Sequence, residues 1–167
     1  MTKLDQLYDR MISYDGGNPH RIQHFTKVLG FSKYIGTMEQ LDVETQFTLE
    51  ATAIVHDIGI KAAEETCGHS TGKLQEELGP ALVEEMLGDL DFSKEVIARV
   101  AYLVGHHHTY DNIDGLDYQI LVEADFLVNL HEKNSDVKTV QNAYHTIFRT
   151  QTGKSLCRRM FGFAGME

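Results

Sequence analysis

Four polar side chains interrupt segments that otherwise have the pattern of buried helix faces: His24, His56, Asp57 and Asp125. His56 and Asp57 are adjacent within the apolar stretch IVHDIGI. A buried carboxylate is costly unless it is hydrogen-bonded, paired or bound to a cation. One cation would satisfy all four side chains at once, so the pattern predicts a metal site.

The expected ligand set contains two imidazoles and two carboxylates. Imidazole combined with carboxylate suits Mn, Fe, Co, Ni or Zn, whereas a larger share of oxygen ligands favours Mg. The expected cofactor is therefore a divalent metal cation whose identity is left open. Taken singly, an inward His is more often a hydrogen-bonded core residue, and an isolated Asp is more often a helix cap. The prediction of a metal site would be wrong only if an ordinary explanation held independently for each of these residues.

Helical spacing of apolar residues dominates the chain, which contains two prolines, Pro19 and Pro80. The pattern predicts helices over about 2–14, 19–38, 43–56, 74–90, 93–108, 117–133 and 136–150. Polar loops are expected at 64–73 and 109–117, and Gly59 is expected to let the chain leave the third helix. The tail from residue 153 has no clear pattern. We therefore expect an all-α, single-domain helical bundle over residues 1–167, with the motif-bearing core at about 20–131.

Composition narrows the classes of function. The chain has 167 residues, of which 42% are hydrophobic, and this is enough for one domain with a sizeable core. A formal net charge of −10 disfavours a nucleic-acid polymer as partner, although a local cation can still attract a small phosphorylated substrate. No apolar run suits a membrane span, no secretory signal is visible, and the two cysteines form no disulfide framework. A cytoplasmic location is therefore expected.

The order His24, then His56-Asp57, then Asp125 on an all-helical chain resembles the HD-domain superfamily of metal-dependent phosphohydrolases. The stretches that carry the resemblance are RIQHFTKVLGF, AIVHDIGIK and LVEADFLVNL. HDIG alone is moderately specific, but HDIG with an upstream His and a downstream EAD at these distances is a strong signal. The resemblance implies a helical bundle in which these four side chains bind a divalent cation. It also implies hydrolysis of phosphate esters, often of nucleotides.

Some members of that superfamily hold a second metal with further histidines. One of these histidines falls near Gln75 of this chain, in LQEELGP, and another falls within GHHHTYDN. The loss of a histidine at Gln75 favours a mononuclear site, with His106 and His107 as possible outer contacts or ligands of a second metal. Successive helix residues diverge by about 100°, so one or two of His106, His107 and His108 are expected to point inward.

The function implied is a metal-dependent phosphohydrolase that acts on a small phosphomonoester or a nucleotide. Asp57 is expected to bridge the metal and orient the attacking water, while the other three side chains serve as ligands. Lys61 and either His106 or His107 are expected to balance charge on the phosphate. The ordinary alternatives are an exposed lysine for Lys61 and a solvated helix end for the histidine run.

Three neighbouring residues have weaker claims on the site. Glu64 and Glu65 are candidates for a general base, although glutamates in a polar loop are usually just solvated, and His20 is a candidate for the mouth. Two alternative functions stay open: a non-catalytic protein that keeps the site as a metal or nucleotide sensor or a structural staple, and a di-iron oxygenase. The substrate, the physiological metal and the oligomeric state do not follow from the sequence.

Overall fold

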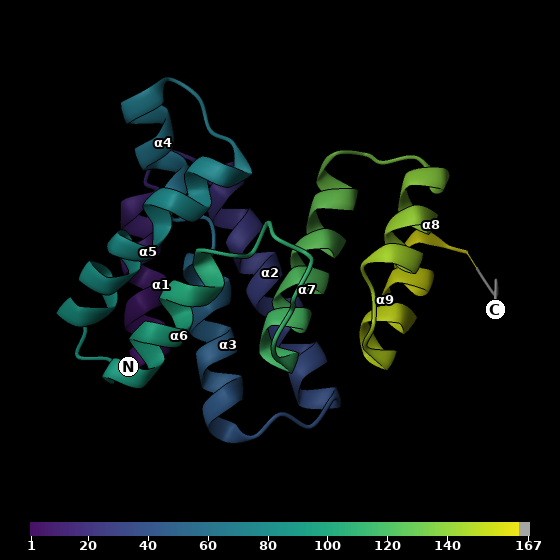
Figure 1. The fold of residues 1–167 in the computed structure, drawn as a ribbon, viewed down its shortest axis with the longest axis horizontal. Helices are drawn as coiled ribbons and strands as arrows, with labels where there is room; N and C mark the ends of the chain where they lie inside the picture. The colour runs from purple at the N-terminus through teal and green to yellow at the C-terminus, as the bar shows by residue number, and fades with distance from the viewer. Residues whose placement is uncertain (164–167) are drawn as a thin grey trace.

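The computed structural model describes residues 1–163, and within that range the chain forms nine α-helices and no strand (Figure 1). The all-α prediction is confirmed. The helices are α1 (Lys3–Tyr14), α2 (Pro19–Met38), α3 (Val43–Val55), α4 (Gly59–Cys67), α5 (Gly72–Asp89), α6 (Lys94–Val104), α7 (Leu116–Glu132), α8 (Val137–Thr146) and α9 (Gln151–Phe161).

Short polar side chains begin most of these helices. Each accepts a hydrogen bond from a backbone N–H of the first turn, which satisfies a donor that has no partner within the helix. Pro19 follows the cap of α2 at the first helical position, where its missing N–H costs nothing. The capping residues are Thr2, Asn18, Asp42, Thr71, Ser93, Asp136 and Thr150.

The core consists of two apolar clusters that meet along α2 and α3. One surrounds α7 and includes the fully buried Tyr118, Leu121 and Phe148, and it joins α7 to α2, α8 and α9. The other joins α1, α3, α5 and α6 around Leu7 and Ile54. In Figure 1, α2 and α3 run through the middle of the molecule between these two groups of helices. No helix among residues 1–163 is long and apolar enough to cross a membrane.

Two segments differ from the expectation. Residues 59–67 form a further helix, α4, after the chain has left α3. The loop before α5 is therefore shorter than the predicted 64–73. A Cβ on Gly59 would lie 2.7 Å from the backbone oxygen of Gln75, so glycine here allows α4 and α5 to pack closely. The tail forms α9, which begins with Thr150, and residues 164–167 lie outside the described range. Each of these segments buries only a few side chains, such as Ala63 and Cys157, so few apolar residues mark it as a helix in the sequence.

Candidate metal centre

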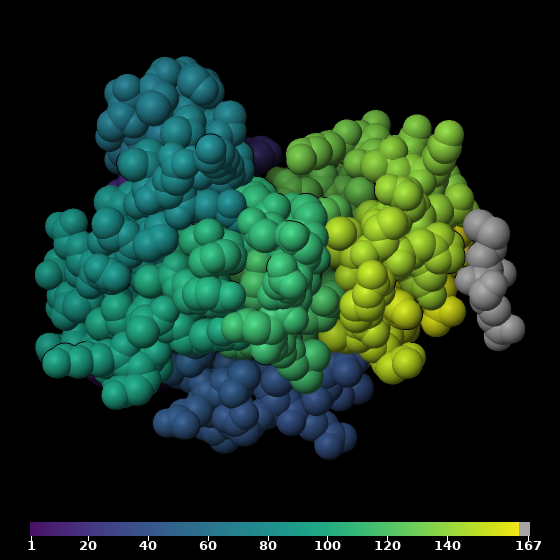
Figure 2. All heavy atoms as spheres, in the orientation of Figure 1, coloured from purple at the N-terminus to yellow at the C-terminus, as the bar shows by residue number. Residues whose placement is uncertain are grey.

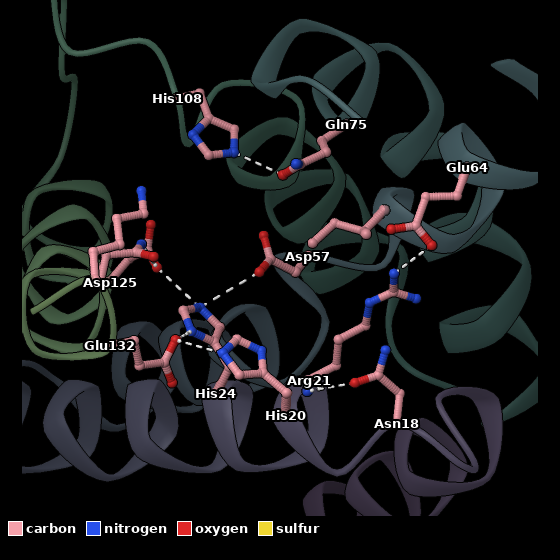
Figure 3. Close-up of a pocket in the computed structure, with 13 residues that line it drawn as sticks. Asn18, His20, Arg21, His24, Asp57, Glu64, Gln75, His108, Asp125 and Glu132 are labelled. Carbon is pink, nitrogen blue, oxygen red and sulfur yellow. Dashed lines mark hydrogen bonds and ion pairs between the residues drawn. The ribbon is translucent and has the colours of Figure 1, made fainter. Parts of the chain in front are cut away.

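The four predicted ligands come from three helices and lie together at one end of α3. His24 is in the first half of α2, His56 caps the C-terminus of α3, Asp57 follows in the turn before α4, and Asp125 lies in α7. His24 and Asp125 are each 6% exposed and His56 is fully buried. Figure 3 shows the ring of His24 between Asp125 on one side and Asp57 on the other.

The ligand atoms of His24, His56 and Asp57 all lie within 4.8 Å of one another, as a single cation requires, and Asp125 adds an oxygen close to both rings. The Nε2 atom of His24 lies 3.2 Å from Nε2 of His56, 3.4 Å from Oδ2 of Asp57 and 3.1 Å from Oδ1 of Asp125. The Nε2 atom of His56 lies 3.5 Å from the same oxygen of Asp57 and 3.6 Å from that of Asp125. Around a cation with bonds of about 2.1 Å, neighbouring ligand atoms are about 3.0 Å apart at octahedral angles and about 3.4 Å apart at tetrahedral angles.

The far side of each ring is held by a hydrogen bond that selects its tautomer. Nδ1 of His56 donates to the backbone oxygen of Ala53 at 2.8 Å, and Nδ1 of His24 donates to Oε2 of Glu132 at 2.9 Å. When Nδ1 carries the proton, Nε2 of the neutral ring offers its lone pair to the centre. Such outer contacts are the usual way in which proteins orient metal-binding histidines.

Without a cation, protons supply the positive charge at this centre. Burial opposes a charge on His56, yet the Asp57 carboxylate and a hydrogen bond to Asp125 raise its pKa to about 9. Burial also favours protonation of both aspartates, but the neighbouring imidazoles hold the pKa of each carboxyl well below its usual range. The site therefore favours two negative charges with positive charge held between them.

A second group of ligand types begins on the other oxygen of Asp57. Nε2 of His107 lies 3.4 Å from Oδ1 of Asp57, and it is buried with no hydrogen-bond partner within residues 1–163. Its Nδ1 donates to the backbone oxygen of Val104 at 2.8 Å, so this ring also turns its lone pair toward the carboxylate. His108 completes the group, and its Nε2 donates to Oε1 of Gln75 at 2.7 Å. Asp57 thus faces two clusters of imidazoles, one with each oxygen.

The structure places two of the expected phosphate contacts, His106 and Lys61, away from the centre. The ring of His106 turns away from the centre, stacks on Tyr102 and bonds to the backbone oxygen of that residue. The histidine run lies in the turn after α6 rather than in the helix, and this turn sends His107 and His108 inward together. The ammonium group of Lys61 donates to the backbone oxygen of Tyr14 at 2.9 Å and lies over the aromatic ring of the same residue. Lys61 therefore does not line the cavity at the centre.

A cavity of about 480 Å³ lies over the centre and is lined by residues of α2, α4, α5 and α7. The surface is hollowed between α4 and the end of α7 (Figure 2). His20, the candidate for the mouth, lines this cavity. Of the two candidates for a general base, Glu64 lines it and Glu65 does not.

Sequence reasoning missed several polar residues of this wall, among them Arg21, Asn129 and Glu132. Arg21 precedes His24 by three positions, and the other two follow Asp125 by four and seven positions. Residues at these spacings share one face of a helix, so the signal was available once the ligands were chosen. Asn129 donates to Oδ1 of Asp125 at 2.7 Å, which makes it a direct support of that ligand.

Comparison with known proteins places the fold. No family model and no curated protein matches the sequence. A predicted HD superfamily hydrolase from an uncultured Thermotogales bacterium superposes with a TM-score of 0.69 at 19% identity, over 96% of this chain and 86% of that one. YpgQ of Bacillus subtilis superposes with a TM-score of 0.63 at 14% identity, over 97% and 90%. The helices and their arrangement therefore show that this chain shares the all-α fold of these two proteins, one of which is described as a predicted HD superfamily hydrolase.

Proposed function

We propose that this protein is a metal-dependent phosphohydrolase whose cation is held by His24, His56, Asp57 and Asp125. The observation that carries the proposal is the convergence of four acceptor atoms. Two imidazole lone pairs and two carboxylates face one point, because the other nitrogen of each ring is occupied by Glu132 or by the backbone. Acceptors arranged in this way need positive charge between them, and a bound cation supplies it.

A divalent cation bound there supplies Lewis acidity, which lowers the pKa of a water and polarises a phosphoryl oxygen. The chain's own groups complete the chemistry. Asp57 touches both clusters, so its carboxylate can accept a proton from the attacking water and hold that water in line. His107 lies against Oδ1 of Asp57 with a free Nε2, and from this buried position outside the cavity lining it can hold that carboxylate in place.

We propose one tightly held ion per chain. The second group is less complete than the first, since the Nε2 atom of His108 is occupied by Gln75. One of the two structural neighbours is described as a predicted HD superfamily hydrolase, and this likeness supports hydrolysis as the proposed reaction. We propose that the substrate is a phosphate ester rather than another kind of ester, because the motifs resemble those of phosphohydrolases and the centre suits a metal.

The test combines metal analysis with a screen for phosphate release. The protein is purified without added metal, its metal content is measured by elemental analysis, and it is then assayed with Mn, Fe, Co, Ni, Zn or Mg and p-nitrophenyl phosphate. We expect metal-dependent release of p-nitrophenol that His56→Ala abolishes and that His69→Ala, a change at an exposed histidine outside the cavity, leaves unchanged. Release that chelators do not affect, or none with any of the metals, would refute the proposed function.

A further inference from the structure

Nearly every side chain that lines the cavity over the metal centre carries a hydrogen-bonding group. Within the described part of the chain, Ile60 is the one hydrophobic side chain in the lining, and no Phe or Tyr contributes to it. Proteins that recognise a nucleobase usually stack it between aromatic or apolar side chains, which is worth about five- to 150-fold in affinity. The aromatic rings in this lining are the imidazoles of His20, His24 and His108. The rings of His24 and His108 already pack against His56 and His107, so the cavity offers little stacking surface to a base.

The polar groups of the wall instead suit hydroxyls. Asn129 donates through Nδ2 to Asp125, which leaves its side-chain oxygen to accept a hydrogen bond. Asn18 uses its oxygen to cap α2 at the backbone N–H of Arg21, which leaves its Nδ2 to donate. A hydroxyl donates and accepts at the same atom, so several hydroxyls on a small carbon chain match a wall that presents both donors and acceptors.

Charge on the wall limits the number of phosphates. The guanidinium of Arg21 lies 2.5 Å from Glu64 and 3.8 Å from Asp15, so carboxylates of the protein already neutralise it (Figure 3). Lys133 lines the cavity from an exposed position. A second phosphate would therefore find one exposed ammonium group and the carboxylates of Glu64 and Glu132, in a protein with a net charge of −10.

From these walls and charges we propose that the substrate is the monophosphate of a small polyhydroxylated molecule, a sugar or polyol phosphate, rather than a nucleotide. This inference rests on the proposed hydrolase function. The phosphate binds at the metal centre and the hydroxylated part contacts the polar wall. A nucleobase at the same position loses its hydration against charged and amide groups and, among the described lining residues, finds only the exposed imidazole of His20 as an unoccupied stacking partner.

The test uses two substrates that share one phosphoester. D-ribose 5-phosphate and adenosine 5′-monophosphate carry the phosphate on the same carbon of the same sugar and differ in the group on C1. We expect kcat/KM for ribose 5-phosphate to exceed that for the nucleotide by about tenfold or more, because the base gains little from stacking and loses its hydration. A nucleotide that is hydrolysed as well or better, or ribose 5-phosphate that is inert while p-nitrophenyl phosphate is hydrolysed, overturns the substrate class alone. If all three compounds are inert with every metal, the hydrolase function fails and this inference fails with it.

A second comparison tests the charge argument. Glu64→Gln releases Arg21 from its ion pair, so we expect the ratio of kcat/KM for glucose 1,6-bisphosphate to that for glucose 6-phosphate to rise about two- to fivefold. Glu65→Gln removes the same charge from an adjacent exposed residue that does not line the cavity, and it should leave the ratio unchanged. Equal changes in the two variants, or no change in either, would show that pairing with Glu64 does not restrict the number of phosphates.

Discussion

Replacing Asp125 with alanine tests whether the carboxylate on α7 holds the cation. Asp125 is 6% exposed, its Oδ1 lies 3.1 Å from Nε2 of His24, and it accepts a hydrogen bond from Asn129 at 2.7 Å. Removing one partner of a buried charged pair costs about 3–5 kcal/mol. For a chain of this size each kcal/mol corresponds to about 2–4 °C, so we expect the metal-free variant to melt about 6–20 °C below the parent.

The pH dependence of that difference has a definite sign. Burial favours the protonated carboxyl, but hydrogen bonds from His24 and His56 hold the pKa of Asp125 in the folded protein below its ordinary value of 3.8. A carboxyl with a lowered folded-state pKa stabilises the fold above its unfolded pKa and loses this contribution as the pH falls through the folded value. The gap in melting temperature should therefore be full near neutral pH and shrink as the pH falls below about 4.

The matched control is Asp117→Ala on the same helix. Asp117 is also 6% exposed and pairs with Arg99 at 2.7 Å, so its loss should cost comparable stability. Melting temperatures are measured in excess chelator, and metal content is measured by elemental analysis after dialysis against metal. We expect Asp125→Ala to lose the ion and Asp117→Ala to keep it. If both variants keep the metal, or both lose it, Asp125 is not a specific ligand and the assignment of the centre is refuted.

Further outcomes follow from the same geometry. Glu132→Gln should weaken metal binding about 10- to 100-fold, measured by competition with a fluorescent chelator, because His24 loses the carboxylate that orients it; an unchanged affinity would show that this contact does not support the ligand. Chelation should lower the melting temperature by about 5–11 °C, since an ion at a hundred times its dissociation constant contributes about 2.7 kcal/mol; identical melting curves after verified removal of metal would contradict this. His107→Ala should keep the metal and lose turnover, whereas His56→Ala should lose both; equal loss of metal in the two variants would make His107 a ligand.

The sequence by itself determined the fold class and the four candidate ligands. Helix periodicity places each residue on a face before any tertiary contact is known, so a polar residue on an apolar face is visible in the pattern. His24 stands in line with Val28, and Asp125 stands in line with Leu121 and Val128, which predicted that both point inward. Both are buried in the structure, and Val28, Leu121 and Val128 lie in the same apolar cluster.

Tertiary structure decided the residues that lie in turns or depend on distant partners. His107 and His108 face the site while His106 does not, because the run follows the end of α6, where the regular rotation of about 100° per residue no longer applies. Lys61 was plausible as a phosphate contact until the backbone oxygen of Tyr14, 47 positions away, proved to hold it. Glu132 acquires its role only because α7 packs against α2 and brings its carboxylate to His24, 108 positions earlier. Local patterns report the face on which a residue lies, whereas the partner that it meets there depends on how the helices pack.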